Sequence, residues 1–136
     1  MSTKVVITGL GCVSPLGNDV ASTWENLVAG RSGVGRVTRF DVSGFKSQLA
    51  AEVKDFDAEQ LFGRKAARRM DRVSQYALAA AGQALAQSAL TITDQNRARV
   101  GALVGSGIGG MGTLIDGLQI LAERGPERVS PFTVPM

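Results

Sequence analysis

Two short apolar runs, each closed by glycine, constrain the fold of this chain most strongly. Val5-Val6-Ile7-Thr8 is β-branched and apolar on both faces, as a buried central strand is, and it ends at Gly9-Leu10-Gly11. Val100-Gly101-Ala102-Leu103-Val104 has the same character and runs into a second glycine-rich turn. Because a helical pattern follows each run, the sequence predicts a layered α/β fold.

Helical signals occupy four places in the chain. A first helix is expected between Asn18 or Asp19, either of which can cap it, and Gly30, which lies where a C-terminal cap belongs. A short turn with Asp57 as its cap is expected over about 57–61, and further helices over about 64–88 and 111–123. The stripe of 64–88 is mostly alanine, which predicts close packing against another element, a second helix among the candidates. Residues 31–56 are irregular, with strand character only around Leu49 to Val53.

Length and composition restrict the function classes. The chain has 136 residues, which is one domain at most, and its net charge of +3 is too small to favour a nucleic-acid partner. It begins without a secretory signal pattern and holds no apolar run of the roughly 18 residues that span a bilayer. The one cysteine excludes an internal disulfide. A cytoplasmic protein without a membrane partner is therefore expected.

The glycine loop is the first candidate site. Gly105, Gly107 and Gly110 match the dinucleotide-binding spacing between a strand and a helix. That fingerprint needs an acidic residue about 20 positions later, after a second strand, and Glu123 lies instead in a helix-like stretch. A tight turn that packs closely or lines a pocket is favoured over a nucleotide site.

A cluster of cations is the second candidate. Its members are spaced to share one face of a helix, namely Arg64, Lys65, Arg68, Arg69 and Arg72. Cations at the start of a helix oppose its dipole, so the cluster costs helix stability. A docking site for an acidic partner and a merely solvated face are both compatible with it.

Nucleophilic and metal chemistry have little support. Cys12 has no histidine to activate it, because the chain contains none, and a small buried hydrophobe is the favoured interpretation. The scattered carboxylates predict no metal site and no cofactor. The apolar, proline-braced segment Ser130-Pro131-Phe132-Thr133-Val134-Pro135-Met136 is unlike an exposed natural terminus, so we expect the parent chain to continue.

These segments together resemble the β-ketoacyl–acyl carrier protein synthases over essentially the whole chain. The resemblance begins in Val5–Gly17 and continues through Trp24, Leu27–Val34, Arg64–Asp71, Gly105–Gly110 and Ser130–Phe132. Ile108 in the glycine loop resembles the type II enzymes. The resemblance implies that residues 1–136 are the incomplete N-terminal half of a thiolase-like fold, a layered α/β structure with a mixed sheet.

The resemblance also implies an activity. Family members transfer an acyl group from acyl carrier protein to a cysteine, decarboxylate malonyl carrier protein, and join the two with the help of two histidines and an oxyanion hole. They act as homodimers in fatty acid elongation. The catalytic cysteine and both histidines belong beyond Met136, so no catalytic residue is assigned here and the chain alone is expected to be inactive.

Site residues follow from the resemblance position by position. The acyl pocket is expected at Gly107, Ile108, Met111, Thr133 and Val134, with Ile108 as its gate and Thr133 departing from a common aromatic. Docking of acyl carrier protein is expected at Lys65, Arg68, Arg69 and Arg128, while Glu127 replaces a basic neighbour. A non-catalytic carrier-protein-binding module, a polyketide-type ketosynthase fragment and a small nucleotide-binding domain stay open as alternatives.

Overall fold

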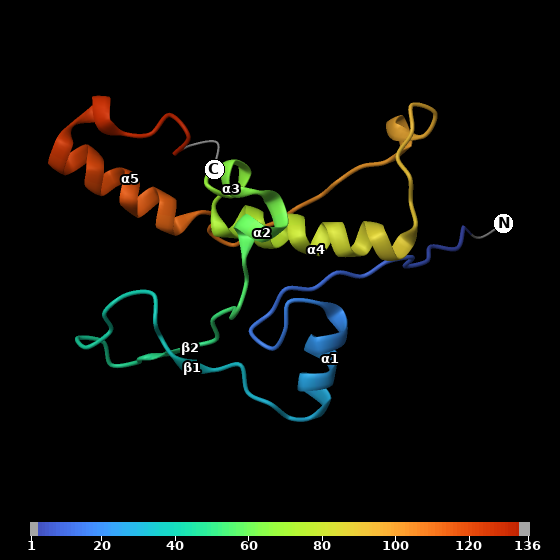
Figure 1. The fold of residues 1–136 in the computed structure, drawn as a ribbon, viewed down its shortest axis with the longest axis horizontal. Coiled ribbons are helices and arrows are strands. Elements are labelled where there is room, and N and C mark those ends of the chain that lie inside the picture. The colour runs from blue at the N-terminus through green and yellow to red at the C-terminus, as the bar shows by residue number, and fades with distance from the viewer. Residues whose placement is uncertain (1–2, 134–136) are drawn as a thin grey trace. The chain divides into compact units, whose positions relative to one another are not determined.

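The computed structural model describes residues 3–133, which group into two units (Figure 1). The first unit comprises residues 3–56 and 79–90, and the second comprises residues 57–78 and 91–133. In chain order the elements are α1 (Val20–Val28), β1 (Gly35–Arg36), β2 (Leu49–Ala50), α2 (Ala58–Phe62), α3 (Arg64–Ala67), α4 (Arg72–Ser88), η1 (Arg97–Arg99), α5 (Met111–Arg124) and η2 (Pro126–Arg128). Helices and a sheet are both present, in agreement with the predicted α/β class.

Helix α1 confirms the predicted start and end signals. The Asp19 side chain accepts a hydrogen bond from the Ser22 N–H at 2.8 Å, so Asp19 rather than Asn18 is the cap. Gly30 follows the last turn with φ of 68° and donates its N–H to the Leu27 carbonyl at 3.0 Å. Glycine adopts this left-handed conformation without steric cost, which explains where the helix stops.

The described sheet is a single antiparallel pair. β1 and β2 pair Gly35 with Ala50 and Arg36 with Leu49. The Val37 N–H extends the pairing to the Gln48 carbonyl at 3.0 Å. The strand expected around Leu49 to Val53 is therefore present but shorter than predicted.

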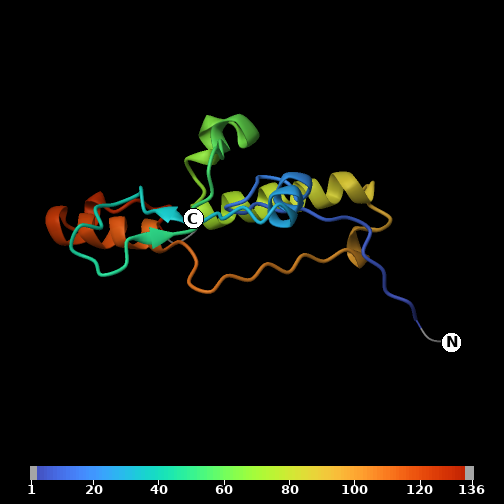
Figure 2. The ribbon, with the colours of Figure 1, turned by 90° about the horizontal axis from the view of Figure 1, so that it is seen from below.

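The two buried strands that the sequence predicts are not formed among the described residues. Val5 is 92% exposed and Leu103 is fully exposed. The segments 5–8 and 100–104 are extended but form no strand (Figure 2). A strand exists only as part of a hydrogen-bonded ladder, and a two-faced apolar strand needs cover on both faces. The residue pattern indicates that need, but within residues 3–133 the structure neither pairs these two segments with a strand nor covers their apolar faces.

A glycine-rich segment packs on α4 within the first unit. A Cβ at Gly9 or Gly11 would overlap the carbonyl oxygens of Ala84 and Ala80, so only glycine lets the two backbones approach this closely. The Cys12 N–H donates to the Gln83 Oε1 at 3.0 Å, and the Leu10 N–H donates to the Gln87 side chain. The alanine stripe thus packs closely, as predicted, but its partner here is an extended segment and not a helix.

The helix predicted over 64–88 is broken in the second unit. Helix α3 ends at Ala67, residues 68–71 form a turn, and α4 begins at Arg72. The Asp71 carboxylate accepts a hydrogen bond from the Val73 N–H at 3.1 Å, which makes Asp71 the cap of a new helix. The expectation of one continuous helix is wrong because apolar periodicity does not register a cap in its middle.

The remaining helices of the second unit agree with the sequence. Asp57 caps α2 by accepting from the Gln60 N–H at 2.9 Å, and α5 ends at Gly125, whose φ is 81°. Among residues 3–133, the buried apolar side chains are Val42 and Ala67, and many larger apolar side chains are exposed. No helix in that range has both the length and the apolar character to cross a bilayer.

Candidate functional site

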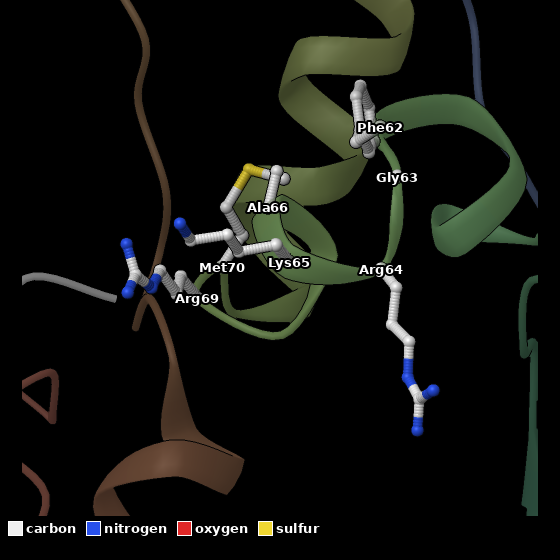
Figure 3. A pocket seen from close by; sticks show the side chains of 7 residues that line it. All are labelled: Phe62, Gly63, Arg64, Lys65, Ala66, Arg69 and Met70. Atoms are coloured by element: carbon white, nitrogen blue, oxygen red, sulfur yellow. The ribbon is translucent and has the colours of Figure 1, made fainter.

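A basic hollow lies around α3. It has a volume of about 610 Å³, and its lining is Phe62, Gly63, Arg64, Lys65, Ala66, Arg69 and Met70 (Figure 3). Figure 3 shows the Arg64 guanidinium on one side of the short helix and the ends of Lys65 and Arg69 on the other. Phe62 and Met70 are half-buried, so apolar side chains and three cations share one surface.

The other cations of this cluster have their own partners. Arg68 forms an ion pair with Glu59 at 3.7 Å, and the Arg72 guanidinium lies 5.8 Å from the centre of the Tyr76 ring. Because the helix breaks between α3 and α4, the five cations do not form the single helical face that their spacing predicts. Of these five cations, Arg64, Lys65 and Arg69 line the hollow.

Arg69 also contacts a segment from the other end of the chain. Its guanidinium lies 5.0 Å from the centre of the Phe132 ring, a cation–π geometry. Arg128, the fourth predicted docking residue, is exposed on η2, which packs against α5. Within residues 3–133 Arg128 makes no contact with the lining of the hollow, so its role in docking stays a prediction.

The residues expected in the acyl pocket lie at the start of α5 and beside its middle. Ile108 is 77% exposed in the glycine loop, and Met111 opens α5 at 43% exposure. A Cβ at Gly107 would meet no atom within 4 Å, so this glycine is in open space here. These three residues lie close together along the chain, and their assignment to a pocket stays a prediction.

Thr133 packs against α5 at Gly117, more than one helical turn after Met111. A Cβ on the buried Gly117 would lie 2.8 Å from the Thr133 Cγ2, so glycine is what allows this approach. Val134 lies outside the described residues. The structure therefore places Thr133 beside α5, the helix that Met111 begins.

Four residues of this region are not among the docking residues that the sequence predicts. Arg64, Phe62 and Met70 line the hollow, although the resemblance assigns a docking role to none of them and only Arg64 belongs to the predicted cation cluster. Asp71 is the fourth, and its signal is local, because an Asp directly before a helical stretch is a typical helix cap.

Neither Cys12 nor the glycine loop gains chemical support. Cys12 is half-buried, with its N–H bound to Gln83. Glu123 lies in the last turn of α5 and accepts from the Gln119 Nε2 at 2.9 Å, so it does not follow the second strand that a dinucleotide site requires. No three potential ligands among residues 3–133 gather closely enough to hold a metal ion.

Known proteins resemble this chain along nearly its whole length. A 3-oxoacyl-[acyl-carrier-protein] synthase 2 of Staphylococcus aureus is 48% identical over 133 residues, covering 98% of this chain and 32% of that protein. The synthase 2 of Vibrio cholerae is also 48% identical, over 132 residues, 97% of this chain and 32% of that protein. The chain therefore spans about a third of the length of these curated relatives.

Solved structures show the same relationship in three dimensions. The ishigamide ketosynthase/chain length factor matches with a TM-score of 0.75 and 33% identity over 95% of this chain and 32% of that one. A β-ketoacyl synthase from Burkholderia phymatum matches with a TM-score of 0.73 and 32% identity over 94% of this chain and 32% of that one. The α/β arrangement is thus the N-terminal portion of the thiolase-like ketosynthase fold. The family model described as "Beta-ketoacyl synthase, N-terminal domain" matches residues 2–136, and the chain belongs to that family.

Proposed function

We propose that this chain supplies the N-terminal portion of a 3-oxoacyl-acyl carrier protein synthase of fatty acid elongation. The observation that carries the proposal is 48% identity to such synthases over 98% of the chain. The reaction is the decarboxylative condensation of malonyl carrier protein with an acyl thioester held on a cysteine. The chain has no histidine, so we expect the 136 residues alone to catalyse no condensation.

The part of the reaction that this chain serves best is carrier-protein docking. Lys65 and Arg69 border a hollow that also offers Phe62 and Met70, so an acidic partner with an apolar side chain fits it in charge and in polarity. Arg68 is already paired with Glu59 and contributes less net charge. Arg128 completes the proposed docking residues from η2.

The acyl pocket is the second contribution. Gly107, Ile108, Met111, Thr133 and Val134 are proposed to line one wall, with Ile108 as the gate for the acyl chain. The packing of Thr133 on Gly117 supports a wall built around α5. The same proposal includes a homodimeric synthase located in the cytoplasm, which sedimentation and fractionation would test.

The proposal is tested with a chimeric synthase. Residues 1–136 replace the corresponding portion of the Vibrio cholerae relative, and condensation of hexanoyl and malonyl carrier proteins is measured. Lys65→Glu combined with Arg69→Glu should raise the KM for carrier protein at least about tenfold, because two attractive charges become repulsive. The kcat should change much less, since these residues do not contact the reacting atoms.

Arg99→Glu is the matched control for Lys65→Glu alone. Arg99 is an exposed cation on η1, and its reversal changes the net charge by the same amount without touching the hollow. Equal effects of both single reversals would contradict docking at the hollow. A chimera that binds carrier protein but never condenses would favour the alternative of a non-catalytic carrier-protein-binding module.

A further inference from the structure

Asp71 lies at the starts of two helices of the second unit. It precedes α4 and accepts from the Val73 N–H at 3.1 Å. Its other oxygen, Oδ2, accepts a short hydrogen bond from the Thr113 hydroxyl in the first turn of α5. One half-buried carboxylate therefore contacts both helix N-termini.

Helix α5 has no cap of its own. Its N-cap residue is Gly110, which makes no side-chain capping bond, and the first turn of α5 holds no acidic residue. Unpaired N–H groups and the helix dipole make this end positive, so a carboxylate from another segment stabilises it. Asp71 provides that carboxylate.

Gly110 allows the carboxylate to come this close. A Cβ at Gly110 would lie 2.8 Å from both the Cγ and the Oδ2 of Asp71, which is nearer than real Cβ atoms approach. The last glycine of the Gly105-x-Gly107-x-x-Gly110 pattern is therefore explained by Asp71, and not by a bound nucleotide.

The electrostatics agree with a charged Asp71. Burial raises the pKa of its carboxyl group, but hydrogen bonds from the Thr113 hydroxyl and from the N–H groups of Val73, Thr113 and Arg72 outweigh burial and hold the pKa below its usual value. The carboxylate is thus ionised at neutral pH, and its negative charge lies beside the N-termini of both helices.

The glycine loop leads directly into this anchored turn. The Gly109 N–H donates to the Ser106 Oγ at 2.9 Å, and the Met111 N–H donates to the Gly109 carbonyl at 3.0 Å. These bonds hold the loop to itself and to the start of α5. The position of Ile108 therefore depends on where the first turn of α5 is held.

We propose that Asp71 is a positioning residue for the acyl-pocket gate, because its carboxylate fixes the start of α5 and thereby the loop that carries Ile108. This inference rests on the proposed function, which assigns the gate to Ile108. It adds a residue of the docking segment, two positions beyond Arg69, to the set that determines which acyl chains are accepted.

The test uses the chimeric synthase with Asp71→Asn, Thr113→Val and their combination. The ratio of kcat/KM for tetradecanoyl over hexanoyl carrier protein is measured, together with the KM for carrier protein. Each single variant should raise the ratio about fivefold, the size expected when one helix cap is lost and the gate is released. The double variant should add little, because both changes break the same bond. Thr113→Ser, which keeps the hydroxyl, should restore the ratio.

Asp19→Asn is the matched control, since it removes a capping carboxylate from α1 in the other unit. In this control the ratio of kcat/KM for tetradecanoyl over hexanoyl carrier protein should equal that of the unmutated chimera. An unchanged ratio in the Asp71 and Thr113 variants, or an equal loss of kcat/KM on both acyl chains, would overturn the inference. If Asp71→Asn does not fold, the Thr113→Val and Thr113→Ser pair decides the question. An unmutated chimera without condensing activity would refute the proposed function itself, whereas an active one with unaltered ratios refutes only the role of Asp71.

Discussion

Replacing Gly11 by alanine should separate the glycine-rich segment from α4. The new Cβ would lie 2.7 Å from the Ala80 carbonyl carbon and 3.1 Å from its Cα, with the carbonyl oxygen nearer still. All of these are backbone atoms of a helix, so no side-chain rotation can relieve the overlap. To clear the carbonyl oxygen the segment must move away by more than an ångström, and the bonds from Leu10 to Gln87 and from Cys12 to Gln83 must lengthen or break.

The expected cost follows from those contacts. Overpacking of this kind costs about 1 to 3 kcal/mol. Each hydrogen bond lost adds about 0.5 to 1.5 kcal/mol. If both bonds are lost, the local unfolding free energy should therefore fall by about 2 to 6 kcal/mol, which lowers the urea midpoint by about 1 M or more.

Gly82 provides the matched control within the same helix. It is exposed in α4, and a Cβ there would meet nothing within 4 Å. Gly82→Ala should therefore raise stability by about 1 kcal/mol, because alanine loses less backbone entropy in a helix. The two variants make the same chemical change with opposite expected signs.

The assay is urea unfolding of the chain followed by helical circular dichroism, with hydrogen exchange of residues 9–13 as a local readout. Gly11→Ala should speed exchange at the Cys12 amide, whereas Gly82→Ala should leave it unchanged or slow it. If both variants shifted the midpoint in the same direction, or if the Cys12 amide kept its protection in Gly11→Ala, the packing of this segment on α4 would be refuted.

Two further predictions concern the second unit. Because the pKa of Asp71 lies below its usual value, the stability that its carboxylate contributes is present above pH 3.8 and is lost as the pH falls through the folded pKa. Acid titration of the helical circular dichroism signal should therefore be shallower in Asp71→Asn than in the unmutated chain. Equal slopes would contradict a charged, hydrogen-bonded carboxylate. Gly125→Ala should lower the urea midpoint of the chain, since a non-glycine residue at φ of 81° costs about 1 to 2 kcal/mol, whereas Gly112→Ala, in open space within α5, should raise it.

Helix ends were predictable because their chemistry is local. Asp19 and Asp57 each accept a hydrogen bond from an N–H three residues later, and Gly30 supplies a positive φ within one turn of the last helical residue. Each of these signals involves residues that are near one another in the sequence. A capping rule can therefore identify them without knowledge of the rest of the fold.

Strands and tertiary contacts were not predictable in the same way. The run at 5–8 has the composition of a buried strand, but a ladder requires a partner that the composition cannot name. The bond from Thr113 to Asp71 joins residues 42 positions apart in the chain, so no local rule could have identified it. Apolar periodicity predicts a single helix over residues 64–88, because it depends on which residues share an apolar face and contains no information on hydrogen bonds.

The contrast between local and long-range contacts also decides which site residues can be tested on the 136-residue chain alone. The surroundings of Lys65 and Arg69 come from Glu59 to Met70, apart from the Phe132 ring, so the docking hollow is built mostly from one short stretch of chain. Its affinity for carrier protein should be measurable on the 136 residues themselves. Ile108 is 77% exposed, and a gate can act only opposite a second wall, which residues 3–133 do not show. Variants of Ile108 are therefore informative only in the chimeric synthase, whereas a charge reversal at Lys65 should weaken carrier-protein binding by the same factor in both.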